Sequence, residues 1–195
     1  MRIELFHEYC REQDCLYGPK QFPSSHSRFL FFRTPGRDPG YLAHEHPRCD
    51  VTVMSGLPGA GKDTWIAQHL AELPRISLDA IREETAAPPT GGQGTVVQAA
   101  REKARAFLRA GENFVWNATN VSREIRKQVV DLMAAYDARV RLVYVEASHD
   151  AFLEQNRNRS SAVPGSAIER IMDRWEVPDP TEAQGVECWI DGRPA

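Results

Sequence analysis

The stretch VTVMSGLPGAGKDTW at residues 51–65 decides the fold that the sequence predicts. A β-branched run precedes a glycine-rich turn, a lysine and the start of an amphipathic segment, which is the order of a phosphate-binding loop. Gly56, Gly59 and Gly61 allow backbone conformations that turn successive N–H groups to one concave side. Lys62 then opens a helix whose positive end faces the same phosphates. The stretch therefore predicts a nucleotide enzyme; the alternative is an ordinary strand-to-helix turn.

The residue after the lysine departs from the usual pattern. That pattern has Ser or Thr there, because the hydroxyl binds magnesium, whereas this chain has Asp63 followed by Thr64. A carboxylate is an acceptable hard ligand, but it adds negative charge beside the phosphates. We expect Asp63 to bind Mg²⁺ directly or through water, or Thr64 to take over. The expected cofactors are ATP, or another nucleoside triphosphate, and Mg²⁺, in a site made of Gly56, Gly59, Ala60, Gly61, Lys62, Asp63 and Thr64.

Length and composition indicate one globular domain with at most a small appendage. The chain has 195 residues, of which 42% are hydrophobic and 26% charged. No apolar run approaches the roughly 20 residues that span a bilayer, and no secretory signal is visible, so we expect a cytoplasmic protein without a membrane partner. Four scattered cysteines indicate reduced thiols. A net charge of −3 argues against a protein that coats nucleic acid, but not against one that grips a strand end.

Strand-like and helix-like segments alternate from residue 51 onward. Apolar strands separated by helices imply a parallel sheet covered on both faces, with ligands at the carboxyl ends of its strands. The predicted class is α/β, with a P-loop kinase domain at 51–195 and an N-terminal appendage at 1–50 that contains a helix at 3–14 and a strand at 28–33. Strands are predicted at 51–55, 75–77, 114–117 and 140–145, and helices at 62–73, 79–84, 95–110, 122–136, 149–160 and 165–175.

Phosphoryl transfer needs more than a phosphate clamp, and candidate residues for the remaining tasks follow the predicted strands. Asp79 follows a short strand, with Arg82 three residues later; alone, such an Asp is more often a helix N-cap. The segment 117–120 ends the next strand, where Asn117 is neutral, so charge compensation of the metal would depend on Asp63. Arg159 lies in a predicted lid that would carry arginines onto the nucleotide phosphates; the alternative is a charged helix end, and the position after the last strand slightly favours the lid.

In this order, the residues resemble the kinase domain of the polynucleotide kinase family, P-loop enzymes that phosphorylate 5′-hydroxyl ends of DNA or RNA. The resemblance implies that Asp79 is the general base, that Arg82 contacts the acceptor-side phosphate and that Arg159 binds the donor phosphates. With Lys62 these are the expected catalytic residues, and Asn120 and Arg126 join Asp79 and Arg82 as substrate-binding residues. It spans about 51–182 and rests on GLPGAGKDTW at 56–65, Asp79 with Arg82, Ala118-Thr119-Asn120 followed by Arg126, Asn156 with Arg159, and Val163-Pro164.

Two residues depart from the family pattern: Asp63, after the lysine, and Gln155, where the lid often has an arginine. The sequence LPGAGKDTW, together with the Cys- and Phe-rich leader, looks like the kinase half of bacterial end-healing proteins in which an HD-type phosphohydrolase precedes the kinase. Residues 1–50 are too few for that domain. We therefore expect a nucleic-acid 5′-OH end as substrate and, outside this chain, an upstream phosphohydrolase domain or partner.

Two other functions fit the same motifs. A kinase of a small-molecule hydroxyl uses the same loop, base and lid, and a non-catalytic nucleotide-binding module would explain Asp63 and Asn117. A polynucleotide acceptor should need a basic groove. Such charges are more often solvated helix faces, so they favour a nucleic acid only modestly. The residues that could line a groove are Arg101, Lys103, Arg105, Arg109, Arg123, Arg126 and Lys127.

Overall fold

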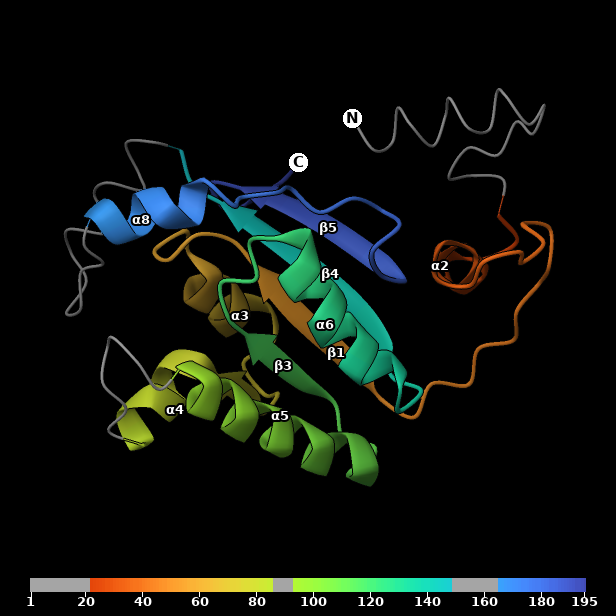
Figure 1. The fold of residues 1–195 in the computed structure, drawn as a ribbon, viewed down its shortest axis with the longest axis horizontal. Coiled ribbons are helices and arrows are strands. Elements are labelled where there is room, and N and C mark those ends of the chain that lie inside the picture. Colours follow the sequence, from red (N-terminus) through yellow and green to blue (C-terminus); the bar gives the residue numbers. More distant parts are fainter. Residues whose placement is uncertain (1–21, 86–92, 149–164) are drawn as a thin grey trace.

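The fold is built on one mostly parallel β-sheet, seen in a computed structural model that describes residues 22–85, 93–148 and 165–195 (Figure 1). The strands lie in the order β2-β3-β1-β4-β5-β6. Neighbours from β2 to β5 pair in parallel, and β6 pairs antiparallel with β5. The predicted α/β class is therefore confirmed. The strands are β1 (Asp50–Ser55), β2 (Arg75–Ser77), β3 (Phe114–Asn117), β4 (Arg139–Glu146), β5 (Gly185–Ile190) and β6 (Arg193–Pro194).

The helices begin where serine side chains can cap them. Ser24, Ser77 and Ser122 each accept a hydrogen bond from the backbone N–H three residues ahead, and so supply an acceptor to the first turns of α2, α4 and α6. No helix in the described ranges is both long and apolar enough to cross a membrane. The described helices are α2 (Ser25–Arg33), α3 (Lys62–His69), α4 (Leu78–Glu84), α5 (Gln93–Ala110), α6 (Arg123–Ala134) and α8 (Gly165–Met172).

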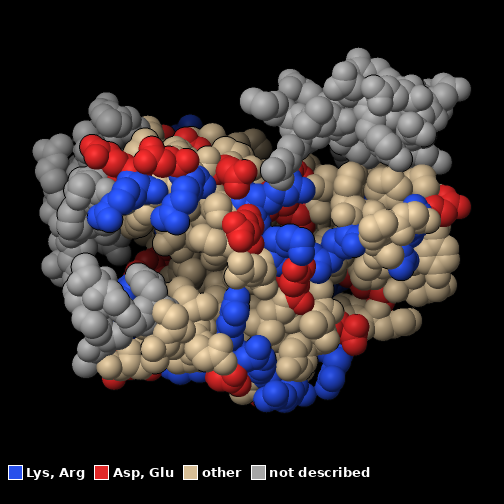
Figure 2. Space-filling view, in the orientation of Figure 1, with Lys and Arg blue, Asp and Glu red and all other residues tan. Residues whose placement is uncertain are grey.

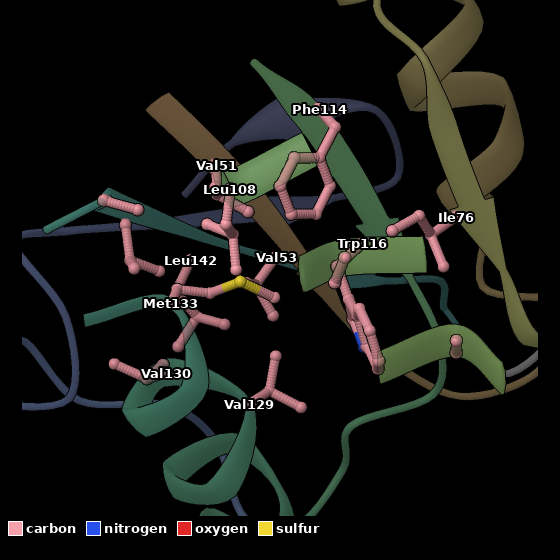
Figure 3. Close-up of a cluster of buried hydrophobic side chains, with 14 of the residues drawn as sticks. Val51, Val53, Ile76, Leu108, Phe114, Trp116, Val129, Val130, Met133 and Leu142 are labelled. Carbon is pink, nitrogen blue, oxygen red and sulfur yellow. The ribbon is translucent and has the colours of Figure 1, made fainter. Parts of the chain in front are cut away.

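Alternating side chains of the strands bury both faces of the sheet. Val51 and Val53 of β1 point to one face, where the larger hydrophobic cluster joins β3 and β4 to α5 and α6 (Figure 3). Met54 points to the other face and packs with Trp65 and Ile66 of α3. In Figure 1, α6 lies in front of the strands and α3 behind them. The prediction of a sheet covered on both faces is thus confirmed.

Some elements of the structure differ from the predicted ones. Residues 28–33, predicted as a strand from their aromatic run, belong to the helix α2. There Phe29 is 1% exposed in the main core, and the Arg33 guanidinium lies 4.8 Å from its ring centroid, so tertiary packing overrides the strand preference of aromatic residues. The helix predicted at 62–73 ends at His69. The strands β5 and β6 were not predicted, because GVECWI lacks a continuous apolar run. The helices predicted at 3–14 and 149–160 lie outside the described residues.

The strand register brings the predicted chemistry to one edge of the sheet. In β2 and β3, Ser77 lies opposite Asn117, so these two strands end side by side. Next to β3, β1 ends at Ser55, directly before the glycine-rich loop. The loop, α4 and the segment after β3 therefore all begin at the carboxyl edge of the sheet, where ligands of open α/β sheets bind.

Candidate phosphate-transfer site

The glycine-rich loop has backbone conformations that require glycine. Gly56, Gly59 and Gly61 have φ angles of 146°, 85° and 93°. A Cβ on Gly56 would lie 2.2 Å from the carbonyl oxygen of Val145, so no other residue fits there. The Gly56 N–H donates to the carbonyl of Thr119 at 2.9 Å, which ties the loop to the segment after β3.

The loop and the first turn of α3 bring positively polarised groups together. The Lys62 side chain is 9% exposed, and its ammonium donates to the carbonyl oxygens of Gly56 at 3.0 Å and Leu57 at 2.8 Å. At the start of α3, Gly61 provides no side-chain cap. Backbone donors and an ammonium at a helix N-terminus fit an anion. On this geometry the loop from Gly56 to Thr64 suits nucleotide phosphates.

Asp63 lies at the centre of a small polar network. Its Oδ1 accepts hydrogen bonds from Asn117 Nδ2 at 2.9 Å and from Arg75 Nη1 at 3.0 Å. The Asp63 side chain is 69% exposed, and Thr64 is exposed beside it on α3. Carboxylate oxygens are ligands that Mg²⁺ accepts, so the site fits that ion. Sequence reasoning missed Arg75, which starts β2 and belongs to no local motif.

Asp79 and Arg82 form an ion pair at the start of α4. Arg82 Nη1 lies 2.8 Å from Asp79 Oδ1, and the Asp79 side chain is 73% exposed. Ser77, not Asp79, caps the helix, so the Asp79 carboxylate is not the N-cap group of α4. Because α4 follows β2 directly, the pair lies at the same sheet edge as the loop. This is where the sequence predicts the general base.

Asn120 and Arg126, predicted to bind substrate, are parts of the folded core instead. Asn120 is 3% exposed with φ of 44°, and its amide donates to the Met54 carbonyl at 2.7 Å. Arg126 is 0% exposed and forms an ion pair with Glu182 at 2.7 Å. Its Nη1 also donates to the carbonyl of Glu176 at 2.7 Å. In this structure neither side chain offers a surface to a ligand. Arg159, the predicted lid arginine, lies outside the described residues.

The helix α8 contacts the loop through a third apolar cluster. Ile171 and Trp175 pack with Leu57 and Ala60 of the loop and with Val121. This contact joins the loop to the segment that follows β4. Sequence reasoning missed it, because the contact joins residues that are far apart in the sequence.

The basic residues expected to line a groove are largely neutralised. Lys103 and Arg105 form ion pairs with Glu84 and Glu102, respectively. Arg123 and Lys127 form ion pairs with nearby aspartates. Figure 2 shows Lys and Arg interspersed with Asp and Glu on this face. Most of these charges are therefore paired with acidic side chains.

A cavity of about 400 Å³ lies at the opposite edge of the sheet. It is lined by residues at the amino ends of β1, β4 and β5, among them Asp50, Arg139 and Gly185, and by Leu70 and Leu73. Because the loop, Asp63 and Asp79 are at the carboxyl ends, this cavity is separate from the phosphate site.

Comparisons with known proteins agree with the geometry. The family AAA_33, described as an AAA domain, matches residues 51–178, more than half of the chain. A candidate kinase from Chloroflexus aurantiacus is 18% identical over 75% of this chain and 87% of its own, with a TM-score of 0.60. A chain of the Pnkp1/Rnl/Hen1 RNA repair complex is 18% identical over 68% of this chain and 45% of its own, with a TM-score of 0.57.

A sugar kinase from Janibacter sp. HTCC2649 is also 18% identical, over 73% of this chain and 85% of its own, with a TM-score of 0.53. At this identity the three likenesses show the fold alone. The family match and the fold agree on a nucleotide-binding P-loop. The chain belongs to the AAA domain family, and its fold is that of the P-loop kinases.

Proposed function

We propose that this protein transfers the γ-phosphate of ATP to 5′-OH ends of DNA or RNA, a step of nucleic-acid end repair. The observation that carries the proposal is the Asp79–Arg82 pair, with 2.8 Å between Oδ1 and Nη1, at the carboxyl edge that also holds the loop. A carboxylate that can accept a proton lies there beside a guanidinium that can bind a phosphate. A 5′-OH end offers both groups, a hydroxyl and the phosphate of the next nucleotide.

Each residue of the site then has a defined task. The hydroxyl oxygen bonds to the γ-phosphorus as the bond to the bridging oxygen breaks, ADP leaves, and the hydroxyl proton goes to Asp79. Lys62 and the loop amides hold the donor phosphates, and Arg82 contacts the acceptor-side phosphate. Asp63 would hold Mg²⁺, which neutralises phosphate charge when bound. Arg159 is expected to bind the donor phosphates.

Recognition of the nucleic acid would be confined to its end. Lys103, Arg105, Arg123 and Lys127 are paired with acidic side chains, so few phosphates away from the end would be neutralised. Salt dependence reports the number of neutralised phosphates. We therefore expect a weak dependence of acceptor binding on salt and on strand length. The expected partners are a nucleic-acid end and an end-processing phosphohydrolase.

A small-molecule hydroxyl is the second candidate acceptor. The pairing of the expected groove residues with acidic side chains favours it, and the fold is shared with the Janibacter sugar kinase. Such an acceptor would use the same loop and the same Asp79. The two candidates differ only in what Arg82 and its surroundings bind.

The test is transfer of labelled γ-phosphate from ATP with Mg²⁺ to a 5′-OH oligonucleotide, as DNA and as RNA. The matched control is the same strand with a 5′-phosphate, and Lys62→Ala provides an enzyme without the phosphate clamp. We expect label only on the 5′-OH strand and only with the unaltered protein. Equal labelling of both strands, or intact ATP binding without any transfer, would contradict the proposal.

A further inference from the structure

P-loop enzymes hold magnesium with residues at two positions, and in this chain the carboxylate is at the other one of the two. The usual pair is a hydroxyl after the lysine and an aspartate beyond a neighbouring strand. Here the residue after Lys62 is the carboxylate Asp63, and β3 ends in the amide Asn117. The pair carries one negative charge in either arrangement. In this chain, that charge lies on α3 instead of on β3.

The structure joins the residues at these two positions directly. Asn117 Nδ2 donates to Asp63 Oδ1 at 2.9 Å. A carboxylate can only accept, so the amide must present its nitrogen to it. Asn117 is 7% exposed and sits in a strand paired on both sides, whereas the Asp63 side chain is 69% exposed. A fixed amide therefore orients an accessible carboxylate.

Arg75 completes the arrangement. Its Nη1 donates to the same oxygen, Asp63 Oδ1, at 3.0 Å. Within the described part of the chain, Asp63 Oδ2 accepts no hydrogen bond. One carboxylate oxygen is thus held by two donors, whereas the other has no donor among the described residues. A guanidinium on a carboxylate competes with a cation for the same negative charge.

We propose that Asp63 and Asn117 together support Mg²⁺ binding, with the negative charge on α3 instead of on β3. We further propose that Arg75 is the counterion that holds Asp63 until the cation binds. This inference rests on the nucleotide-binding half of the proposed function and does not depend on the acceptor. It assigns Asp63 to the metal, Asn117 to the orientation of Asp63, and Arg75 to the strength of metal binding.

The test measures binding of a fluorescent, non-hydrolysable ATP analogue to the full chain, with Mg²⁺ and with EDTA. The variants are Asp63→Ser, Asn117→Asp and the two combined. We expect Asp63→Ser to lose about 10- to 100-fold of the tightening by Mg²⁺, because the carboxylate ligand is gone. Asn117→Asp alone should weaken binding of the analogue in EDTA, because it adds a second carboxylate, and so more negative charge, beside the phosphates. The combined variant restores the usual hydroxyl-and-carboxylate pair and should recover most of the tightening.

The affinity in EDTA is the internal control, since Lys62 and the loop supply it without metal. Two results would overturn the proposal: tightening by Mg²⁺ in Asp63→Ser within about twofold of the unaltered protein, or tightening in the combined variant no greater than in Asp63→Ser. Because no acceptor is present, failure of the 5′-OH kinase proposal leaves this measurement unchanged.

The role of Arg75 has its own measurement. Arg75→Gln removes the competing cation, so half-saturation of the analogue complex should need less Mg²⁺. The matched control is Arg105→Gln, which removes another surface arginine paired with a carboxylate, Glu102, at 2.6 Å on α5. A Mg²⁺ midpoint of Arg75→Gln that equals that of the control would overturn the counterion role.

Discussion

Gly56 is the residue whose identity the structure constrains most closely. It has a φ of 146°, and a Cβ there would lie 2.2 Å from the Val145 carbonyl oxygen. Gly36 also has a positive φ, 74°, but a Cβ there meets nothing within 4 Å. Substitutions at these two positions therefore separate the energetic cost of backbone strain from that of a steric clash.

Gly36→Ala should cost only backbone strain, roughly 1–3 kcal/mol of unfolding free energy, whereas Gly56→Ala should exceed that range because the Val145 carbonyl must also move. Urea unfolding of both variants measures the difference. Equal losses in the two would show that β4 does not restrict the loop.

Asp79 is the residue on which turnover should depend most. Asp79→Asn keeps the shape of the side chain but removes its proton acceptor, and should lower kcat by about 10²- to 10⁴-fold while ATP binding persists. The matched control is Glu84→Gln, at another exposed carboxylate on α4 that pairs with a basic side chain, Lys103. Steady-state kinetics of the two variants compares them. A loss in Glu84→Gln as large as in Asp79→Asn would remove Asp79 as the base.

At the scale of elements, the segment 176–182 is fastened to α6 by buried charges. The Arg126 guanidinium is 0% exposed and pairs with Glu182, which is 5% exposed. Arg126→Met should lose about 3–5 kcal/mol of stability, because it leaves a buried carboxylate without its partner. Lys127→Met breaks a surface pair of the same helix and should lose at most about 1 kcal/mol. Chemical denaturation of both variants provides the comparison, and similar losses would contradict the structural role of Arg126.

The same segment should also make the fold sensitive to acid. Burial alone would raise the pKa of Asp179, but hydrogen bonds from Thr181 and the charge of Arg123 outweigh it and hold the pKa below its ordinary value. The ionised form therefore stabilises the fold above the ordinary carboxyl pKa, near 4, and that stability is lost as the pH falls through the lower folded-state pKa. Asp179→Asn should flatten the dependence of unfolding free energy on pH below about 4. An unchanged slope would contradict it.

Local sequence patterns correctly predicted the elements whose formation depends mainly on residues close together in the sequence. The strands β1, β3 and β4 follow from their short apolar runs, and α6, predicted at 122–136, spans Arg123–Ala134 with Ser122 as its N-cap. The helix α2 was predicted wrongly as a strand, because burial of Phe29 in the main core outweighs its strand preference. The contact of Arg75 with Asp63 and the burial of Arg126 depend on residues distant in the sequence, so no local pattern could indicate them.

At the scale of the whole molecule, a sheet buried on both faces leaves its two edges for ligands. The carboxyl edge gathers the loop and Asp63, which follow β1, and Asp79, which follows β2. The opposite edge has the cavity of about 400 Å³ and none of these groups. Because the fold is shared with kinases of different acceptors, the acceptor must be identified from the site and not from the architecture.

The most direct test of the central claim is a competition between acceptors. One reaction contains labelled ATP, Mg²⁺, a 5′-OH oligonucleotide and a mixture of sugars, each acceptor at the same concentration. We predict that the label enters the oligonucleotide, because Asp79 and Arg82 together match a hydroxyl next to a phosphate. Label in a sugar, with none on the oligonucleotide, would contradict the 5′-OH kinase and establish a small-molecule kinase in its place.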